Sequence, residues 1–427
     1  MAIILVLVQY AVWFFARKVL RSAYHPAVVL CQLWFFVVLS TVIFAPDFYF
    51  SPMAFLVIVV MQMGAVLGGA SYYFLLGGGN AFSVRHINGD YKYFREIVYG
   101  SLFFGAVAVY ATLRAEGFGI GAIMSPSGLL QVARAMSLAR YEEQFQIPLV
   151  ARLGQMFVFF ASAVAGFTFA VDKNRYRKFE YLLPIFPSLL IAVIMTTRAA
   201  VLYNLTFWIC AYMSSSLLLS GRIDLVLITR RTGMALGGGV LSVAVMFIVL
   251  QFLRGGITDM GRLKEILLHL RAWPFGSISG FSIWTDRYDF NTSVTGGYYT
   301  LFGIFDQLGI QARKSGLYTD YVNIGSASWS NIYTVFRGLI SDFTVVGAVG
   351  FMGVMGLLGS ISVKMCLQGK AHFASLLVAT YTFFLWSPII SFFGYTAHLG
   401  AFFLFGLYLK FAQRRIRYVY RRVGMAT

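Results

Sequence analysis

Residues 26–45 read PAVVLCQLWFFVVLSTVIFA, twenty residues in a row without a charged side chain. An α-helix rises about 1.5 Å per residue, so a run of about 20 apolar residues matches the hydrocarbon thickness of a bilayer. A helix also satisfies its own backbone hydrogen bonds, as a segment surrounded by lipid must. The stretch therefore predicts a membrane-spanning helix.

Ten further stretches meet the same criterion, which predicts an all-α, polytopic helical bundle of about eleven spans in one integral membrane domain, 1–427. The candidates lie near 2–16, 26–45, 53–76, 97–113, 147–170, 181–197, 199–219, 233–253, 341–361, 373–390 and 396–411. No basic segment precedes the first run, so we expect a first span rather than a cleaved signal peptide. Only Arg198 interrupts 181–219, and that region has more than one possible division.

The composition supports a membrane protein. Apolar residues make up 59% of the 427 residues and charged residues only 12%, with a mean hydropathy of +0.75. Soluble domains carry about a quarter charged residues, so this chain lacks the polar surface that a soluble protein needs. The net charge of +18 would indicate nucleic-acid binding in a soluble protein. In a membrane protein we attribute it to topology and expect no nucleic-acid partner.

The distribution of basic residues gives the orientation. If alternate loops share a side, 21 of the 34 Lys and Arg residues fall on the side of the C-terminal tail, and the other 13 are spread over much longer loops. Cytoplasmic loops are enriched in Lys and Arg, so we expect a cytoplasmic C-terminus and an N-terminus on the opposite side. Two long loops then lie outside, a smaller one at 114–146 and a large one at 254–337.

Each outer loop contains a predicted helix. In the smaller loop, Ser125-Pro126-Ser127 is typical of a helix start. In the large loop, Asp259 is a candidate N-cap for an amphipathic helix at the membrane interface. The apolar face of that helix comprises Leu263, Ile266, Leu267, Leu270 and Trp273. Glycine, serine and threonine interleaved with aromatics follow, as in Phe275-Gly276-Ser277, and we interpret this part as a functional loop.

Arginine dominates the outer basic residues. These are Arg114, Arg134, Arg140, Arg152, Arg198, Arg254, Arg262, Arg271, Arg287, Arg313 and Arg337, beside only Lys264 and Lys314. Guanidinium binds phosphate bidentately. Arg198, Arg254 and Arg337 stand where apolar spans meet the outer face, at the depth of a lipid-linked pyrophosphate. The alternative is ordinary contact of helix-end side chains with lipid headgroups.

The remaining candidates for chemistry are acids and histidines. An outer carboxylate could serve as a general base, although a solvated or helix-capping carboxylate is more common. His269 and His398 titrate near neutral pH, but a single histidine is more often structural. The sequence has no phosphate-binding glycine loop, no Asp-x-Asp pair and no metal-ligand cluster, so we expect neither a metal nor a cofactor. The three cysteines lie in or beside apolar runs and indicate no disulfide framework.

One run resembles a known family. Trp329-Ser-Asn331-Ile-Tyr333-Thr-Val-Phe-Arg337-Gly-Leu-Ile-Ser-Asp342-Phe-Thr-Val-Val-Gly347 is similar to the Asn-x-Tyr-Thr…Asp-Phe-Gly…Gly segment of Wzy-type polymerases, the bacterial oligosaccharide repeat-unit (O-antigen) polymerases. Met195-Thr-Thr-Arg198 resembles their Thr-Gly-Ser-Arg turn. Phe275-Gly-Ser-Ile-Ser-Gly-Phe281 resembles a Gly-Ser/Pro-Ile-x-x-Phe element. The resemblance covers about 190–360, with departures at Thr197 (typically Ser) and Thr344 (typically Gly).

The resemblance implies a glycosyltransferase of the GT-C type in the bacterial inner membrane, which needs no metal and has a periplasmic outer face. Its substrates would be oligosaccharides linked to undecaprenyl pyrophosphate, and membrane lipids and a chain-length regulator would be its other partners. The expected pyrophosphate- and substrate-binding residues are Arg198, Arg254, Arg337, Arg287, Asn331 and Tyr333. Asp342 and His269 are the candidate catalytic residues, and Asp342 has the alternative role of capping the helix that follows it.

Two other functions remain open at the level of sequence. An O-antigen ligase would use the same donor but transfer it to another acceptor. A flippase or other transporter for the same lipid would place charged or broken-helix sites near the bilayer midplane. The predicted spans are almost free of charge, which favours an enzyme with its polar groups in the outer loops.

Overall fold

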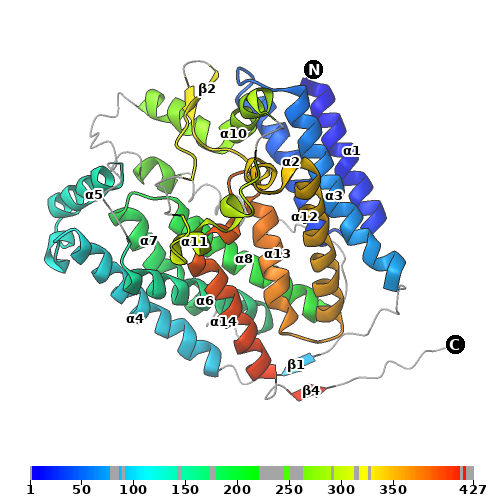
Figure 1. Ribbon diagram of the computed structural model, residues 1–427. Coiled ribbons are helices and arrows are strands. Elements are labelled where there is room, and N and C mark those ends of the chain that lie inside the picture. The colour runs from blue at the N-terminus through cyan, green and yellow to red at the C-terminus, as the bar shows by residue number, and fades with distance from the viewer. Residues whose placement is uncertain are drawn as a thin grey trace. The chain divides into compact units, whose positions relative to one another are not determined.

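The computed structural model describes residues 2–76, 86–88, 92–141, 147–172, 179–220, 245–250, 263–289, 293–311, 317–325, 328–413 and 417–419. Most of these residues are helical (Figure 1). The chain divides into two compact units, and the division falls within helices α8 and α10. The first unit comprises 1–90, 213–224 and 271–427, and the second comprises 91–212 and 225–270.

Long apolar helices dominate the first unit. They are α1 (Ala2–Leu20), α2 (Pro26–Phe44), α3 (Pro52–Leu76), α12 (Val335–Leu367), α13 (Phe373–Trp386) and α14 (Thr396–Gln413). The helix α10 (Leu263–Arg287) enters this unit at Arg271, and the short α11 (Tyr298–Gln307) follows it. Two short antiparallel strand pairs complete the unit, the hairpin of β2 (Val322–Gly325) with β3 (Ser328–Ser330), and the pairing of β1 (His86–Asn88) with the distant β4 (Arg417–Val419).

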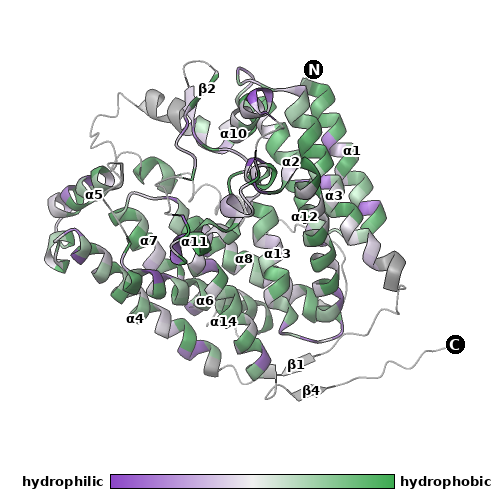
Figure 2. Ribbon diagram, in the orientation of Figure 1, coloured by the Kyte–Doolittle hydropathy of each residue, from purple (hydrophilic) through white to green (hydrophobic). Residues whose placement is uncertain are grey.

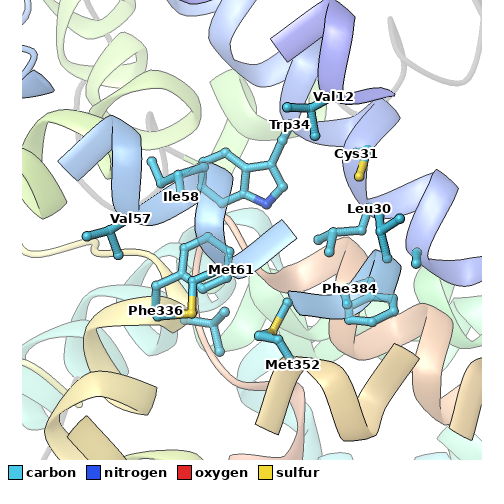
Figure 3. Packing of buried hydrophobic residues seen from close by; sticks show 14 of the residues in the cluster. Val12, Leu30, Cys31, Trp34, Val57, Ile58, Met61, Phe336, Met352 and Phe384 are labelled. Atoms are coloured by element: carbon cyan, nitrogen blue, oxygen red, sulfur yellow. The ribbon is translucent and has the colours of Figure 1, made fainter. Parts of the chain in front are cut away.

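The core of the first unit lies among α1, α2, α3, α12 and α13. Trp34 on α2 is fully buried and stacks on Phe336 of α12, with 5.2 Å between the ring centroids. Figure 3 shows these two rings with Ile58, Met61 and Met352, which come from α3 and α12. Buried apolar side chains therefore join helices that are far apart in the sequence.

Most residues of these helices are hydrophobic (Figure 2), and many of the exposed side chains are apolar as well. On α1, the side of the helix that faces away from α2 and α3 carries Ile3, Leu7 and Phe14, which are 74%, 60% and 51% exposed. Water would make such a surface unfavourable, whereas lipid makes it the normal one. Among the described residues, seven helices are long and apolar enough to cross a membrane.

Helices α3 and α12 pack with their backbones in contact because small residues line the interface. A Cβ atom added to Gly68 would lie 1.9 Å from the carbonyl oxygen of Gly353, and one added to Gly356 would lie 1.9 Å from that of Ala65. Only glycine fits at such positions. Close contact through small residues is a common basis for helix association in membranes.

The second unit is also helical. It contains α4 (Lys92–Ala115), η1 (Ile120–Ile123), α5 (Pro126–Tyr141), α6 (Leu149–Val171), η3 (Glu180–Leu182), α7 (Ile185–Ile194) and most of α8 (Ala199–Ser220). The predicted start of α5 is confirmed, because Ser125 Oγ accepts a hydrogen bond from the Gly128 amide at 3.1 Å. Gly166 of α6 lies so close to the Trp208 carbonyl of α8 that a Cβ atom would collide with it.

Ten of the predicted spans correspond to described helical segments, and most of the eleventh, 233–253, falls outside the described residues. The division of 181–219 is confirmed, since α7 ends at Ile194 and α8 begins at Ala199. The first predicted span is a helix of 19 residues. How many of these helices cross the membrane, and in which direction, stays a prediction.

Two helices are longer than the sequence indicated. The irregular structure expected at Phe275-Gly276-Ser277 is wrong, because α10 continues through Pro274 to Arg287, whereas the position of 254–337 outside the membrane stays a prediction. Tertiary packing supports this continuation. An added Cβ on Gly276 would lie 2.7 Å from Ile324 Cδ1, and one on Gly280 would lie 2.7 Å from the Ile332 carbonyl oxygen. The second helix, α12, starts at Val335 instead of 341 and contains a kink at Thr344.

Candidate functional site

In the described part of the first unit, a cluster of hydrogen-bonded and aromatic side chains surrounds Arg337 in the first turn of α12. The Arg337 side chain is only 12% exposed and forms a bidentate ion pair with Asp320, with Nη1–Oδ2 and Nη2–Oδ1 distances of 2.9 and 3.1 Å. Its Cζ atom lies 4.0 Å from the ring centroids of both Tyr318 and Tyr333. Trp284 of α10 approaches it at 5.6 Å. We call these five residues the Arg337 cage.

Aromatic rings and a carboxylate together fix the guanidinium in this cage. A cation over an aromatic face is stabilised by the ring quadrupole, and the paired hydrogen bonds add orientation. The two tyrosine rings meet edge to face, with 5.1 Å between their centroids. The arginine therefore has one defined position, with its charged end directed toward Asp320.

Hydrogen bonding and charge set the protonation states in the cage. Burial alone would raise the pKa of Asp320, but the hydrogen bonds and charge of Arg337, with the Tyr333 hydroxyl, outweigh it and hold this pKa below its ordinary value. Burial raises the pKa of Tyr333 to about 12 against the opposing charge of Arg337. At neutral pH the Tyr333 hydroxyl therefore stays protonated and donates a hydrogen bond to Asp320 Oδ2, with an oxygen–oxygen distance of 3.0 Å.

The residues singled out in the run 329–347 are brought together around this cage. Asn331 donates from Nδ2 to the Tyr318 carbonyl at 3.3 Å, which anchors the loop that carries Tyr318 and Asp320. The position after Arg337, which is Gly338, has little room for a side chain. A Cβ atom at Gly338 would lie 3.1 Å from both Tyr299 Cβ and the Tyr318 hydroxyl oxygen.

Asp342 is buried, and both of its carboxylate oxygens accept hydrogen bonds. Its Oδ1 accepts from the Tyr299 amide at 2.9 Å and from Thr295 Oγ1 at 2.5 Å, and its Oδ2 accepts from the amide and the hydroxyl of Thr300 at 2.7 and 2.6 Å. The carboxylate therefore caps the N-terminus of α11, which precedes it in the sequence, and not the helix that follows. In this arrangement no carboxylate oxygen is left for a substrate hydroxyl.

The cap at Asp342 also supports the cage. By fixing the first turn of α11, it positions Tyr299, whose ring stacks on that of Tyr318 with 5.5 Å between the centroids. Tyr318 in turn covers Arg337. A continuous series of contacts thus connects Asp342 with the guanidinium.

The other predicted binding residues differ in what the structure describes. Arg287 is exposed at the end of α10, one helical turn after Trp284, and therefore on the side of α10 that faces the cage. In the second unit, Arg198 lies between α7 and α8, and its Cζ atom is 5.1 Å from the ring centroid of Phe247. Burial lowers the pKa of Arg198.

Two predicted residues cannot be placed in a site. Arg254 lies outside the described residues, as does the side chain of His269, whose backbone belongs to α10. His398, the other histidine noted in the sequence, is buried, and its Nδ1 lies 2.9 Å from the Phe392 carbonyl oxygen. That contact fits a structural role.

The sequence did not indicate three members of the cage, Trp284, Tyr318 and Asp320, as partners of Arg337. Asp320 is 17 positions from Arg337, and the β2–β3 hairpin between them brings the two together. No periodic pattern predicts such a contact. The only signal was the aromatic richness of 254–337.

A second polar cluster fixes the loop between α2 and α3 to α10. Asp286 accepts hydrogen bonds from Tyr49 and Ser51 at 2.8 and 2.5 Å, and Arg271 forms a bidentate pair with Asp47 at 2.8 Å. These bonds hold the segment of α10 that carries Trp284. The cluster therefore acts as a support for the cage.

Comparisons with known protein families, with curated proteins and with solved structures found no match to this chain.

Proposed function

We propose that this chain is a Wzy-type polysaccharide polymerase of the bacterial inner membrane, which joins oligosaccharide repeat units carried on undecaprenyl pyrophosphate at the periplasmic face. The observation that carries the proposal is the Arg337 cage. Asn331, Tyr333 and Arg337 of the family-like run converge there, and Asp342 supports it through α11. A cation fixed among aromatic rings offers the chemistry that such a substrate requires at its lipid-linked end, a bidentate ligand for phosphate.

The backbone at Thr344, one of the two departures from the family pattern, also favours the proposal. Thr344, where the pattern has glycine, has φ 64° and ψ 175°, a region that glycine adopts almost alone. The chain thus has a glycine-type conformation at this position without the glycine.

The reaction is a displacement at the anomeric carbon of the donor sugar. A hydroxyl oxygen of the acceptor unit forms the new C–O bond, the bond to the lipid pyrophosphate breaks, and the pyrophosphate leaves with the electron pair while the hydroxyl proton passes to a base. Arginines at the outer face stabilise the departing negative charge. We assign that role to Arg337 and Arg287 of the first unit, and Arg198 and Arg254 stay candidates for it from the sequence alone.

The proposal is tested by complementation in a cell that lacks the chain. Arg337→Ala and Arg198→Ala should each reduce long polysaccharide to single repeat units, at unchanged protein level in the membrane. Arg114→Ala, a change of an exposed arginine at the end of α4, is the matched control and should leave the chain-length distribution intact. Full-length polysaccharide in both of the first two variants would refute the assignment.

A further inference from the structure

The Arg337–Asp320 pair has the geometry of an anion-binding site in which a carboxylate of the protein itself takes the place of the anion. Two guanidinium nitrogens meet two carboxylate oxygens at 2.9 and 3.1 Å, the bidentate arrangement that arginine also adopts with phosphate. The Tyr333 hydroxyl adds a third donor, which lies 3.0 Å from both Oδ2 and the backbone carbonyl oxygen of Asp320. Three donors thus converge on one pair of anionic oxygens.

The two partners differ in how firmly they are held. The Arg337 side chain is 12% exposed and is enclosed by Tyr318, Tyr333 and Trp284, whereas Asp320 is 52% exposed. Helix α12 carries the arginine, but Asp320 belongs to an irregular segment before β2. An anion arriving from solvent therefore meets the carboxylate side of the pair first.

Replacing Asp320 by a ligand would require little rearrangement. Asp320 is half exposed, so water already competes for its carboxylate, and an incoming anion would replace it as the partner of the enclosed guanidinium. The arginine and the Tyr333 hydroxyl would keep their positions and donate to the incoming oxygens. Arg287, exposed one turn after Trp284, supplies a second positive charge on the side of α10 that faces the cage.

We propose that the Arg337 cage is a binding site for a diphosphate group in which the Asp320 carboxylate occupies the place of the ligand until the ligand displaces it. The inference rests on the proposed function for the identity of the natural ligand, a lipid-linked pyrophosphate. It adds that Asp320 competes with that ligand. Asp320 thus acts as a positioning residue that keeps the empty cage ordered.

Binding of inorganic pyrophosphate and of farnesyl pyrophosphate to the purified full chain in detergent, measured by calorimetry, tests the proposal. Asp320→Asn removes the competing charge and should tighten binding of both probes by about fivefold. Arg337→Lys loses the bidentate geometry and should weaken binding by about tenfold or more. Asp306→Asn, with the same change of charge on α11, is the matched control and should leave the affinity within about twofold.

The double variant Asp320→Asn with Arg337→Lys separates local competition from general electrostatics. The gain from Asp320→Asn should vanish in the Arg337→Lys background, because there is no longer a bidentate site to release. Thermal unfolding of each variant verifies that the protein is folded. Tighter binding of farnesyl pyrophosphate alone would assign the gain to the lipid and not to the diphosphate, and would overturn the proposal.

Unchanged or weaker binding in Asp320→Asn, an equal gain in Asp306→Asn, or full affinity in Arg337→Lys would each overturn the proposal as well. None of these results depends on polymerase activity. A chain that bound diphosphate as expected but made no polysaccharide would leave the competition by Asp320 standing and refute the proposed function.

Discussion

At the scale of single residues, Thr344 is one of three described non-glycine residues with a positive φ, beside Arg21 and Thr196. Its φ of 64° and ψ of 175° interrupt α12 directly after Asp342 and Phe343. A non-glycine residue in this backbone conformation costs about 1–3 kcal/mol of folding free energy. Glycine avoids this strain, and the backbone entropy that it loses on folding costs somewhat less. The strain persists because the cap on α11 fixes the preceding residues.

Replacement of Thr344 by glycine should therefore stabilise the protein, by about 1 kcal/mol. Thermal unfolding in detergent measures the effect. Val345→Gly, one position later in regular helix, is the control and should destabilise by about 1 kcal/mol or more. A lower unfolding temperature for Thr344→Gly would show that the threonine side chain contributes more than the strain costs.

Asp342 is a second residue whose role a substitution can decide. Asp342→Asn keeps one acceptor oxygen but replaces the other by an NH2 donor that faces the amide of Tyr299 or of Thr300, so we expect a loss of about 2–4 kcal/mol in the free energy of unfolding. Activity should fall together with stability. Normal thermal unfolding with abolished activity would instead identify Asp342 as the catalytic base.

At the scale of elements, the contact between α3 and α12 depends on glycine. Gly68→Ala would drive a methyl group into the Gly353 carbonyl, and we expect a destabilisation of about 2 kcal/mol or more. Gly350→Ala on α12 is the matched control. Nothing lies within 4 Å of its added Cβ atom, so the higher helix propensity of alanine should make it neutral or stabilising. Equal unfolding temperatures for the two variants would contradict this packing.

The elements also show how far sequence reasoning extends. Apolar runs located the long helices because lipid requires about 20 apolar residues in succession. They did not reveal that α10 continues through Pro274, since there Gly276 and Gly280 serve close packing and not loop flexibility. The candidate site likewise has one part that the sequence predicted and one part that depends on tertiary structure. Arg337 stood out at the end of an apolar run, but its partner Asp320 depends on a hairpin that only tertiary structure brings into place.

At the scale of the whole molecule, the predicted orientation has a direct test. The native cysteines, Cys31, Cys210 and Cys366, are buried, so an impermeant maleimide should react little with the unmodified protein. Met124→Cys, at a position that is 79% exposed in the loop 114–146, should be labelled in right-side-out vesicles. Lys370→Cys, on the side of the C-terminal tail, should react only after permeabilisation. Labelling of Lys370→Cys in intact vesicles, and of Met124→Cys only after permeabilisation, would show that the orientation is opposite to the predicted one.

The central claim is that this chain joins lipid-linked repeat units to one another. The most direct measurement supplies the purified protein, in liposomes, with undecaprenyl-pyrophosphate-linked repeat units as the only substrate and separates the products by size. The account predicts a ladder of products that grow one repeat unit at a time and disappear in the Arg337→Ala variant. Unreacted substrate with the folded wild-type protein would contradict it and would favour a ligase, which needs a different acceptor.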